Sequence, residues 1–201
     1  MPQTLSAKGL FRRGPDEADA ARYRAEARRR RLVEPYIDGR LLEIGCGHGG
    51  LADLCSPKNY LGVDDDPGHV LTAKSRAPTH EFALALPAPQ RQFDTVVVHE
   101  KLQSVDSHRA ALERWAGHLR PGGHMVVTLP FAPLALWTPA GQQAIAPITR
   151  AYMHDVARGA GMTLVSDRTM LREGCKLFVL RLDRPAAALT GSEGAARSAR
   201  P

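Results

Sequence analysis

The chain has 201 residues, a net charge of +6 and 43% hydrophobic residues. This length allows one domain with a sizeable core, but not a nucleotide-binding domain followed by a full second catalytic domain. No run of 18 apolar residues predicts a transmembrane helix, and the N-terminus lacks a signal-peptide core. The three scattered cysteines fit reduced thiols, so we expect a cytoplasmic protein, and no Cys or His spacing indicates a metal site.

The N-terminal segment is strongly basic. Residues 22–31 read RYRAEARRRR, and most of these residue types favour a helix. We predict a basic helical segment over residues 1–38 that caps the cleft of the domain after it. A solvated helix face is the simpler interpretation of the charge, and contact with a polyanion such as nucleic acid is the alternative.

Strands and helices alternate over the predicted domain, residues 39–183. Apolar runs predict seven strands, in LLEI, NYLGVD, HEFALAL, FDTVVV, HMVVTL, MTLVSD and KLFVLRL. Helices are predicted over GGLADLC, PGHVLTAKSRA, DSHRAALERWAGHL and TRAYMHDVARGAG. Such alternation is typical of a Rossmann-like, mostly parallel sheet with helices on both faces. The short link between the last two strands predicts an antiparallel hairpin at one edge.

Two further segments have unusual compositions. The stretch PFAPLALWTPAGQQAIAP, residues 130–147, holds four prolines and cannot be one regular helix. Residues 184–201 contain one leucine and no aromatic residue, so they are predicted to be a disordered tail.

The first strand ends in a loop with three glycines at alternate positions, Gly45, Gly47 and Gly49. Glycines at this turn let the backbone bend tightly and approach a ligand closely. With Gly50, and with Asp64 about 20 residues on, the loop also satisfies the dinucleotide-binding pattern. However, Glu43 lies in the strand just before the loop, where a pyrophosphate would gain nothing from another negative charge. This carboxylate disfavours a dehydrogenase.

The segments LLEIGCGHGG, GVDDDP, FDTVVVHEKLQSV and LRPGG follow one another along the chain. In this combination and order they resemble the class I S-adenosylmethionine-dependent methyltransferases, over residues 40–183. The resemblance implies a seven-stranded sheet with an antiparallel last strand, S-adenosylmethionine as the cofactor, and methyl-transfer activity.

The resemblance also implies roles for individual residues. The loop residues at the cofactor's methionine part would be Gly45, Cys46, Gly47 and Gly49, with Cys46 as a small residue in a tight place. Glu43 would lie near the cofactor's amino end, and Asp64 would accept hydrogen bonds from both ribose hydroxyls. Asp65 would help position the adenine. His99 and Glu100, just after the fourth strand, would face the reactive end.

The acceptor is less well defined by the sequence. Glu81 is the one acid near the third strand, so no residue is assigned to the adenine amino group. A general base is needed only for a protonated acceptor, and His99 and His154 are the candidates because histidine suits neutral pH. A structural or surface role is the alternative for both.

We expect a small-molecule acceptor, because the motifs of relatives that methylate base amino groups or arginine are missing. Two alternatives stay open. One is methylation of RNA or protein through the arginine-rich helix, and the other is a non-catalytic cofactor-binding module on the same fold.

Overall fold

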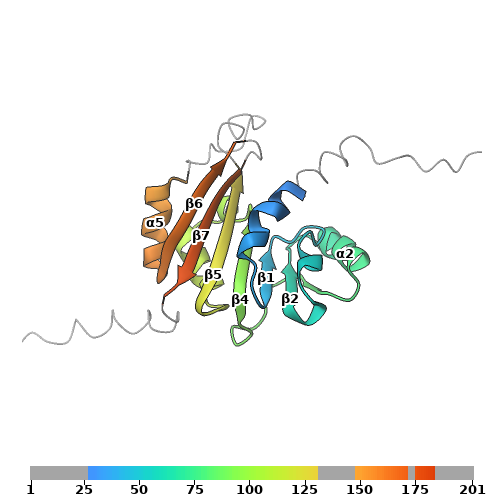
Figure 1. Cartoon of the computed structure of the whole chain (residues 1–201). Helices are drawn as coiled ribbons and strands as arrows, with labels where there is room; N and C mark the ends of the chain where they lie inside the picture. The colour runs from blue at the N-terminus through green and yellow to red at the C-terminus, as the bar shows by residue number, and fades with distance from the viewer. Residues whose placement is uncertain (1–26, 131–147, 172–174, 184–201) are drawn as a thin grey trace, which may run out of the picture.

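The computed structural model describes residues 27–130, 148–171 and 175–183. The predictions for residues 1–26, for most of the proline-rich stretch and for the C-terminal tail lie outside these ranges. The described residues form a seven-stranded sheet in the order β3-β2-β1-β4-β5-β7-β6, with helices packed against it (Figure 1). The predicted fold class is therefore confirmed.

Five parallel strands make up most of the sheet: β1 (Leu41–Ile44), β2 (Tyr60–Val63), β3 (Glu81–Ala83), β4 (Phe93–His99) and β5 (Leu119–Pro130). The last two strands along the chain are β6 (Met162–Met170) and β7 (Cys175–Leu182). β7 lies between β5 and β6 and is antiparallel to both. This is the predicted antiparallel pair, with β6 on the edge. β5 begins earlier than the predicted strand HMVVTL and includes the preceding residues LRPGG.

The helical elements fall near their predicted positions, except for the helix predicted directly after the glycine loop. They are a helix over residues 27–33, η1 (Glu34–Tyr36), α2 (Pro67–Arg76), α3 (His108–Ala116) and α5 (Arg150–Gly159). Side chains cap three of them at the N-terminus, where free backbone N–H groups need acceptors. The capping residues are Asp66 for α2, Ser107 for α3 and Thr149 for α5.

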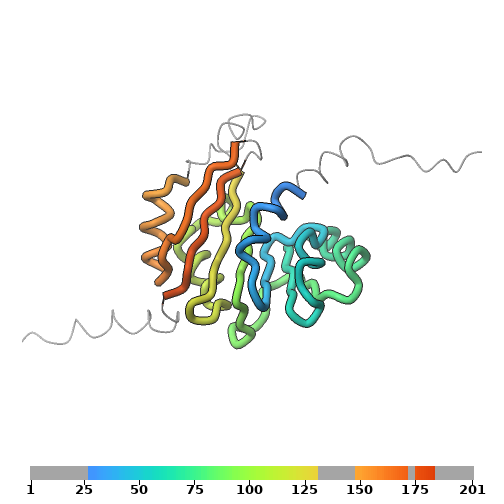
Figure 2. The backbone as a smooth tube through the Cα atoms, viewed as in Figure 1, coloured from blue at the N-terminus to red at the C-terminus, as the bar shows by residue number. Residues whose placement is uncertain are grey.

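The helices cover both faces of the sheet, and the core forms two clusters accordingly. On one face, Leu112 of α3 and Met153 of α5 pack against the sheet and are fully buried. On the other face, Val33 of the N-terminal helix and Val70 of α2 do the same. Figure 2 shows residues 27–33 crossing in front of the sheet, next to β4, β5 and β7. Residues 27–33 and α2 therefore share one side of the sheet.

The helix predicted after the glycine loop is wrong. Residues 47–51 form turns, and only the short 3-10 segment η2 (Ala52–Leu54) follows them. Gly49 has φ of +77°, which an α-helix does not allow, and Gly50 is itself a poor helix former. At Gly49 a Cβ would stand 2.9 Å from the ring of Phe82. The loop is therefore packed directly against β3, and its own backbone must provide any contacts to a ligand.

Two further structural observations bear on function. No helix within the described ranges is long and apolar enough to cross a membrane. In the same ranges, no group of three or more His, Cys, Asp or Glu side chains could hold a metal ion.

Candidate active site

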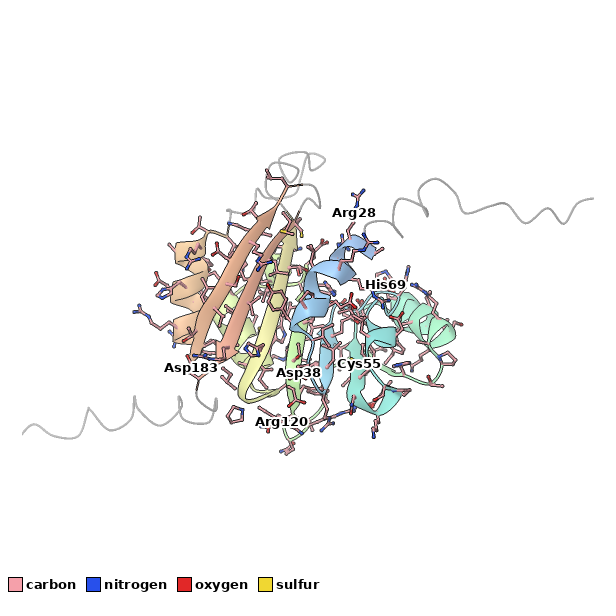
Figure 3. All side chains as sticks on the ribbon, in the orientation of Figure 1. Arg28, Asp38, Cys55, His69, Arg120 and Asp183 are labelled. Atoms are coloured by element: carbon pink, nitrogen blue, oxygen red, sulfur yellow. The ribbon has the colours of Figure 1, made fainter. Side chains whose placement is uncertain are left out.

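The central strands β1 and β4 are neighbours, and the chain leaves them toward opposite edges of the sheet. In such sheets, ligands bind beyond the carboxyl ends of the strands at this point of reversal. The glycine loop follows β1, and residues 100–104 follow β4. Figure 3 shows Arg28 and His69 toward this upper side of the molecule, whereas Asp38, Arg120 and Asp183 lie at the opposite end.

The backbone of the glycine loop is exposed to open space at one residue. Gly47 has φ of +52°, and a Cβ there would have no atom within 4 Å. Its N–H group donates a hydrogen bond to Asp64 Oδ2 at 2.9 Å. By contrast, a Cβ at Gly45 would stand 2.7 Å from the carbonyl oxygen of His99. A ligand can therefore approach the backbone at Gly47, while Gly45 lets β1 and β4 come close together.

Asp64, directly after β2, joins the loop to the strand that precedes α2. Its side chain is only 4% exposed. Besides the bond from Gly47, its Oδ1 accepts from the backbone N–H of Asp66 at 3.0 Å and lies 3.2 Å from His69 Nδ1. A carboxylate has about four lone-pair positions, so Oδ2 keeps one for a ligand hydroxyl. Asp66 instead caps α2, which is the structural role that an acid before a helix favours.

Glu43 lies in the middle of β1 and is 1% exposed. The hydroxyl of Tyr60 donates a hydrogen bond to Glu43 Oε2 at 2.5 Å. Tyr60 reaches this carboxylate because Gly62, two residues further along β2, has no side chain: a Cβ there would stand 2.7 Å from the hydroxyl. Burial first, and the Glu43 charge second, raise the pKa of Tyr60 well above its usual value, so this hydroxyl stays a donor.

His99, the last residue of β4, continues this polar arrangement. Its Nε2 lies 3.3 Å from Glu43 Oε1, and its Nδ1 lies 3.2 Å from Thr128 Oγ1 of β5. Tyr60, Glu43, His99 and Thr128 thus form a buried polar chain across β2, β1, β4 and β5. Both ring nitrogens of His99 have a partner, so action as a base would require the exchange of one contact for the acceptor. No sequence motif indicated Tyr60 or Thr128.

Cys46 is buried in the loop, with 4% of its surface exposed. Burial, followed by the nearby Glu43 and Asp64 carboxylates, raises the pKa of its thiol far above the ordinary value. A thiol that stays protonated is a poor nucleophile. Burial and a raised pKa thus disfavour a catalytic thiolate, and a contact of Cys46 with the cofactor stays a prediction.

Charged side chains bridge the elements around the loop. Lys101 runs from the end of β4 along Gly45 to Asp65, with Nζ 2.6 Å from Asp65 Oδ1. The hydrogen bond from Lys101 and its positive charge hold the pKa of Asp65 below the usual range. Glu100 has φ of +45°, a strained value for a residue with a side chain, and pairs with Arg29 at 2.9 Å. The N-terminal helix thus contacts the end of β4.

His154 lies elsewhere in the described structure. It is on α5, its side chain is 56% exposed, and its Nδ1 is 3.3 Å from Asp155 of the same helix. The neighbouring Tyr152 bonds through its hydroxyl to His108 of α3 at 2.7 Å. Within the described residues, His154 is not joined to the buried polar chain, so its catalytic role stays a prediction.

The chain shares sequence and fold with known proteins. A family model described as a methyltransferase domain matches residues 17–172. The chain is 32% identical over 96 residues to a trans-aconitate 2-methyltransferase of Methylobacterium radiotolerans, covering 44% of this chain and 37% of that protein. It is 31% identical over 118 residues to a fatty-acid O-methyltransferase of Mycolicibacterium smegmatis, covering 53% and 43%. The chain therefore spans less than half the length of these curated relatives.

A solved structure shows the same fold. It is the N-methyltransferase NodS from Bradyrhizobium japonicum in complex with S-adenosyl-L-homocysteine, with a TM-score of 0.57 and 23% identity. The match covers 81% of this chain and 87% of that one. From the family model, the sheet order and the glycine loop between two buried acids, we conclude that the chain belongs to the class I S-adenosylmethionine-dependent methyltransferases.

Proposed function

We propose that this protein transfers a methyl group from S-adenosylmethionine to a small-molecule acceptor. The observation that carries the proposal is the open backbone at Gly47 with two buried carboxylates beside it, Glu43 and Asp64. A loop without a Cβ at its open residue can bind a ligand closely. Carboxylates that flank it suit a ligand with an ammonium group at one end and a diol at the other.

The residues present fit the cofactor as follows. Glu43 would complement its amino end, and Asp65 would lie toward the adenine. Asp64 would accept one ribose hydroxyl at the position left on Oδ2, and the second at Oδ1 when His69 gives up its contact there. When bound, the sulfonium supplies an activated methyl group. The protein then contributes mainly alignment of the acceptor and exclusion of water.

His99 has two possible roles in this proposal. In the described arrangement it bridges Glu43 and Thr128, which fixes the carboxylate beside the loop. If its contact with Thr128 is exchanged for the acceptor, His99 can take a proton during transfer. His154 is a second candidate base, and the two are distinguished by a His99→Gln variant assayed with the natural acceptor.

The family relatives support a small molecule as the acceptor. By their names, the two relatives described above act on trans-aconitate and on a fatty acid, and both of these are carboxylic acids. In addition, Arg29 and Arg30 of the basic helix are paired with Glu100 and Asp53, which reduces the positive field that a polyanion would meet. We therefore favour a small acidic acceptor over RNA.

The test is calorimetric titration of the full chain with S-adenosylmethionine, S-adenosylhomocysteine and NAD, followed by an assay for S-adenosylhomocysteine release with a panel of carboxylic acids. We expect both methionine cofactors to bind and NAD not to bind at similar concentration. Binding of NAD alone would disprove the proposed function. RNA binding that is tight and falls steeply with salt would instead support a nucleic-acid substrate.

A further inference from the structure

A groove lies on the same face of the sheet as the buried polar chain, between the N-terminal helix and the β6–β7 pair. Its volume is about 180 Å³. Its rim carries Arg31 and Arg168, and its floor is apolar, with contributions from Leu32, Tyr36, Met170 and Leu177. We call it the Arg31–Arg168 groove. No predicted cofactor residue lines it, and neither arginine was singled out as a site residue from the sequence.

Within the described ranges, the two arginines differ from neighbouring arginines in having no carboxylate partner. Arg29, Arg30 and Arg150 each form an ion pair with a carboxylate. Among the residues that the structure describes, Arg31 and Arg168 have no such partner, although 137 positions separate them in sequence and both line one groove. Two guanidinium groups around one small space repel each other and favour an anion between them. Their planar donor groups match a carboxylate in particular.

The floor of the groove indicates what the carboxylate is attached to. Leu177 is 2% exposed, and Leu32, Tyr36 and Met170 are half-buried around it. An apolar body would remove this surface from water, whereas a small hydrophilic anion would not. A volume of about 180 Å³ is below the 300–1,000 Å³ that is typical of a complete ligand pocket. The groove therefore suits one end of a longer molecule.

The register of the sheet connects this groove to the proposed reaction centre. Arg168 of β6 pairs with Leu177 of β7, Leu177 pairs with Thr128 of β5, and Thr128 pairs with His99 of β4. Paired residues point to the same face, so these four side chains form one row. Three strand spacings of about 4.8 Å place Arg168 about 14 Å from His99 along the row.

We propose that the Arg31–Arg168 groove binds the carboxylate end of an amphipathic acid, and that this acid is the methyl acceptor. Only the identification of the ligand as the acceptor rests on the proposed function. The binding site itself follows from the two arginines, which have no carboxylate partner in the described part of the chain, together with the apolar floor and the small volume.

The test measures binding of octanoate to the full chain by ligand-observed NMR, with octanamide as a neutral molecule of the same shape. The variants are Arg31→Gln, Arg168→Gln and the double substitution. Arg158→Gln is the matched control, because Arg158 is an exposed arginine on α5, which packs against the opposite face of the sheet. Binding of S-adenosylhomocysteine is measured in every variant to show that each one is folded.

We expect octanoate to bind at least about tenfold more tightly than octanamide, and the double substitution to remove this difference. The Arg158→Gln variant should behave as the wild type does. Equal binding of the two probes, no binding of octanoate, or binding unchanged in the double variant would each overturn the proposal. If the wild-type protein binds octanoate but not S-adenosylhomocysteine, the proposed function is disproved and the groove remains a binding site for the acid.

Discussion

The buried polar chain and the Arg31–Arg168 groove lie on one face of the sheet, yet they differ in how their charged groups are satisfied. In the buried chain, Glu43 accepts a bond from Tyr60 and contacts His99. In the groove, two exposed guanidinium groups share an apolar floor and have no carboxylate among the described residues. Among the described residues, the polar groups of the first region are paired without a ligand, whereas the guanidinium groups of the second would gain a counter-charge from an anionic ligand.

The two regions should bind ligands in different ways. Where polar groups are already paired, a ligand must displace a partner, so affinity is a difference between two sets of contacts. Lys101 is in this position because it pairs with Asp65. Asp64 is in it at Oδ1, which already has two partners, whereas Oδ2 keeps one position for a ligand hydroxyl. Where charges are unpaired, the ligand removes a repulsion. We therefore expect substitutions in the two regions to affect different ligands.

The largest effect is expected for Asp64→Ala. The carboxylate would bind the ribose hydroxyls and also holds the Gly47 N–H, so its loss should weaken S-adenosylhomocysteine binding by about 1.5–3 kcal/mol. The matched control is Asp66→Ala, which removes the cap of α2 and should lower the free energy of unfolding by about 0.5–2 kcal/mol with little change in affinity. Titration calorimetry and urea unfolding separate the two effects. Equal losses of affinity in the two variants would contradict the assignment of Asp64, rather than Asp66, as the acid that binds the ribose.

The next effect concerns stability rather than binding. In Gly62→Ala, the new Cβ would stand 2.7 Å from the Tyr60 hydroxyl and 2.7 Å from the Phe82 ring. Both neighbours are buried, so we expect the free energy of unfolding to fall by about 1–3 kcal/mol. The control is Gly68→Ala, where the new Cβ would approach only the flexible side chain of Asp66. If both variants unfold at the same urea concentration as the wild type, the space at Gly62 is not needed for the polar chain.

The sequence predicts the glycine loop and its two buried acids far better than it predicts the groove. Glu43, Gly47 and Asp64 lie within 22 positions of one another in the printed sequence. Two adjacent parallel strands bring them together, as short apolar runs and glycine spacing indicate. Arg31 and Arg168 meet only because β7 lies between β5 and β6. Their pairing depends on strand register, which no local pattern specifies.

Two further differences between the predicted and the observed structure have local causes. The helix after the glycine loop was predicted from its apolar residues, but the positive φ of Gly49 and its contact with Phe82 exclude it. No local pattern indicates a polar role for Tyr60, because the gap that lets its hydroxyl reach Glu43 is created by Gly62, two residues further along the strand. Both differences depend on a glycine whose lack of a side chain leaves room for an aromatic neighbour in the folded protein.

A third prediction tests the polar chain directly. Tyr60→Phe keeps the packing of the ring but leaves the buried Glu43 without one hydrogen bond, so the free energy of unfolding should fall by about 1.5 kcal/mol. The comparison is Tyr152→Phe, which removes an exposed bond to His108 and should have a smaller effect. Urea unfolding at pH 7 measures both. A smaller loss for Tyr60→Phe than for Tyr152→Phe would contradict the assignment of the short bond to Glu43.

The smallest effect is expected for Lys101, whose side chain lies along Gly45 and ends at Asp65. Asp65 is 81% exposed, and an exposed ion pair contributes little, so Lys101→Met should change stability by less than about 1 kcal/mol. Binding is a sharper measurement. Lys101 lies along Gly45, so a cofactor that binds at the loop would have to displace it from Asp65. Removal of Lys101 should therefore tighten S-adenosylmethionine binding by about two- to fivefold.

The pH dependence provides the control for the Lys101 prediction. The pKa of Asp65 is lowered in the folded protein, so its contribution to stability is present above the unfolded value of about 3.9 and is lost as the pH falls through the folded one. The ion pair is therefore intact at both pH 6 and pH 8, and the gain in affinity should be the same at each. Weaker cofactor binding in Lys101→Met at both values would mean that Lys101 is itself a ligand of the cofactor. In that case the glycine-loop region, like the Arg31–Arg168 groove, would bind its ligand through a cation.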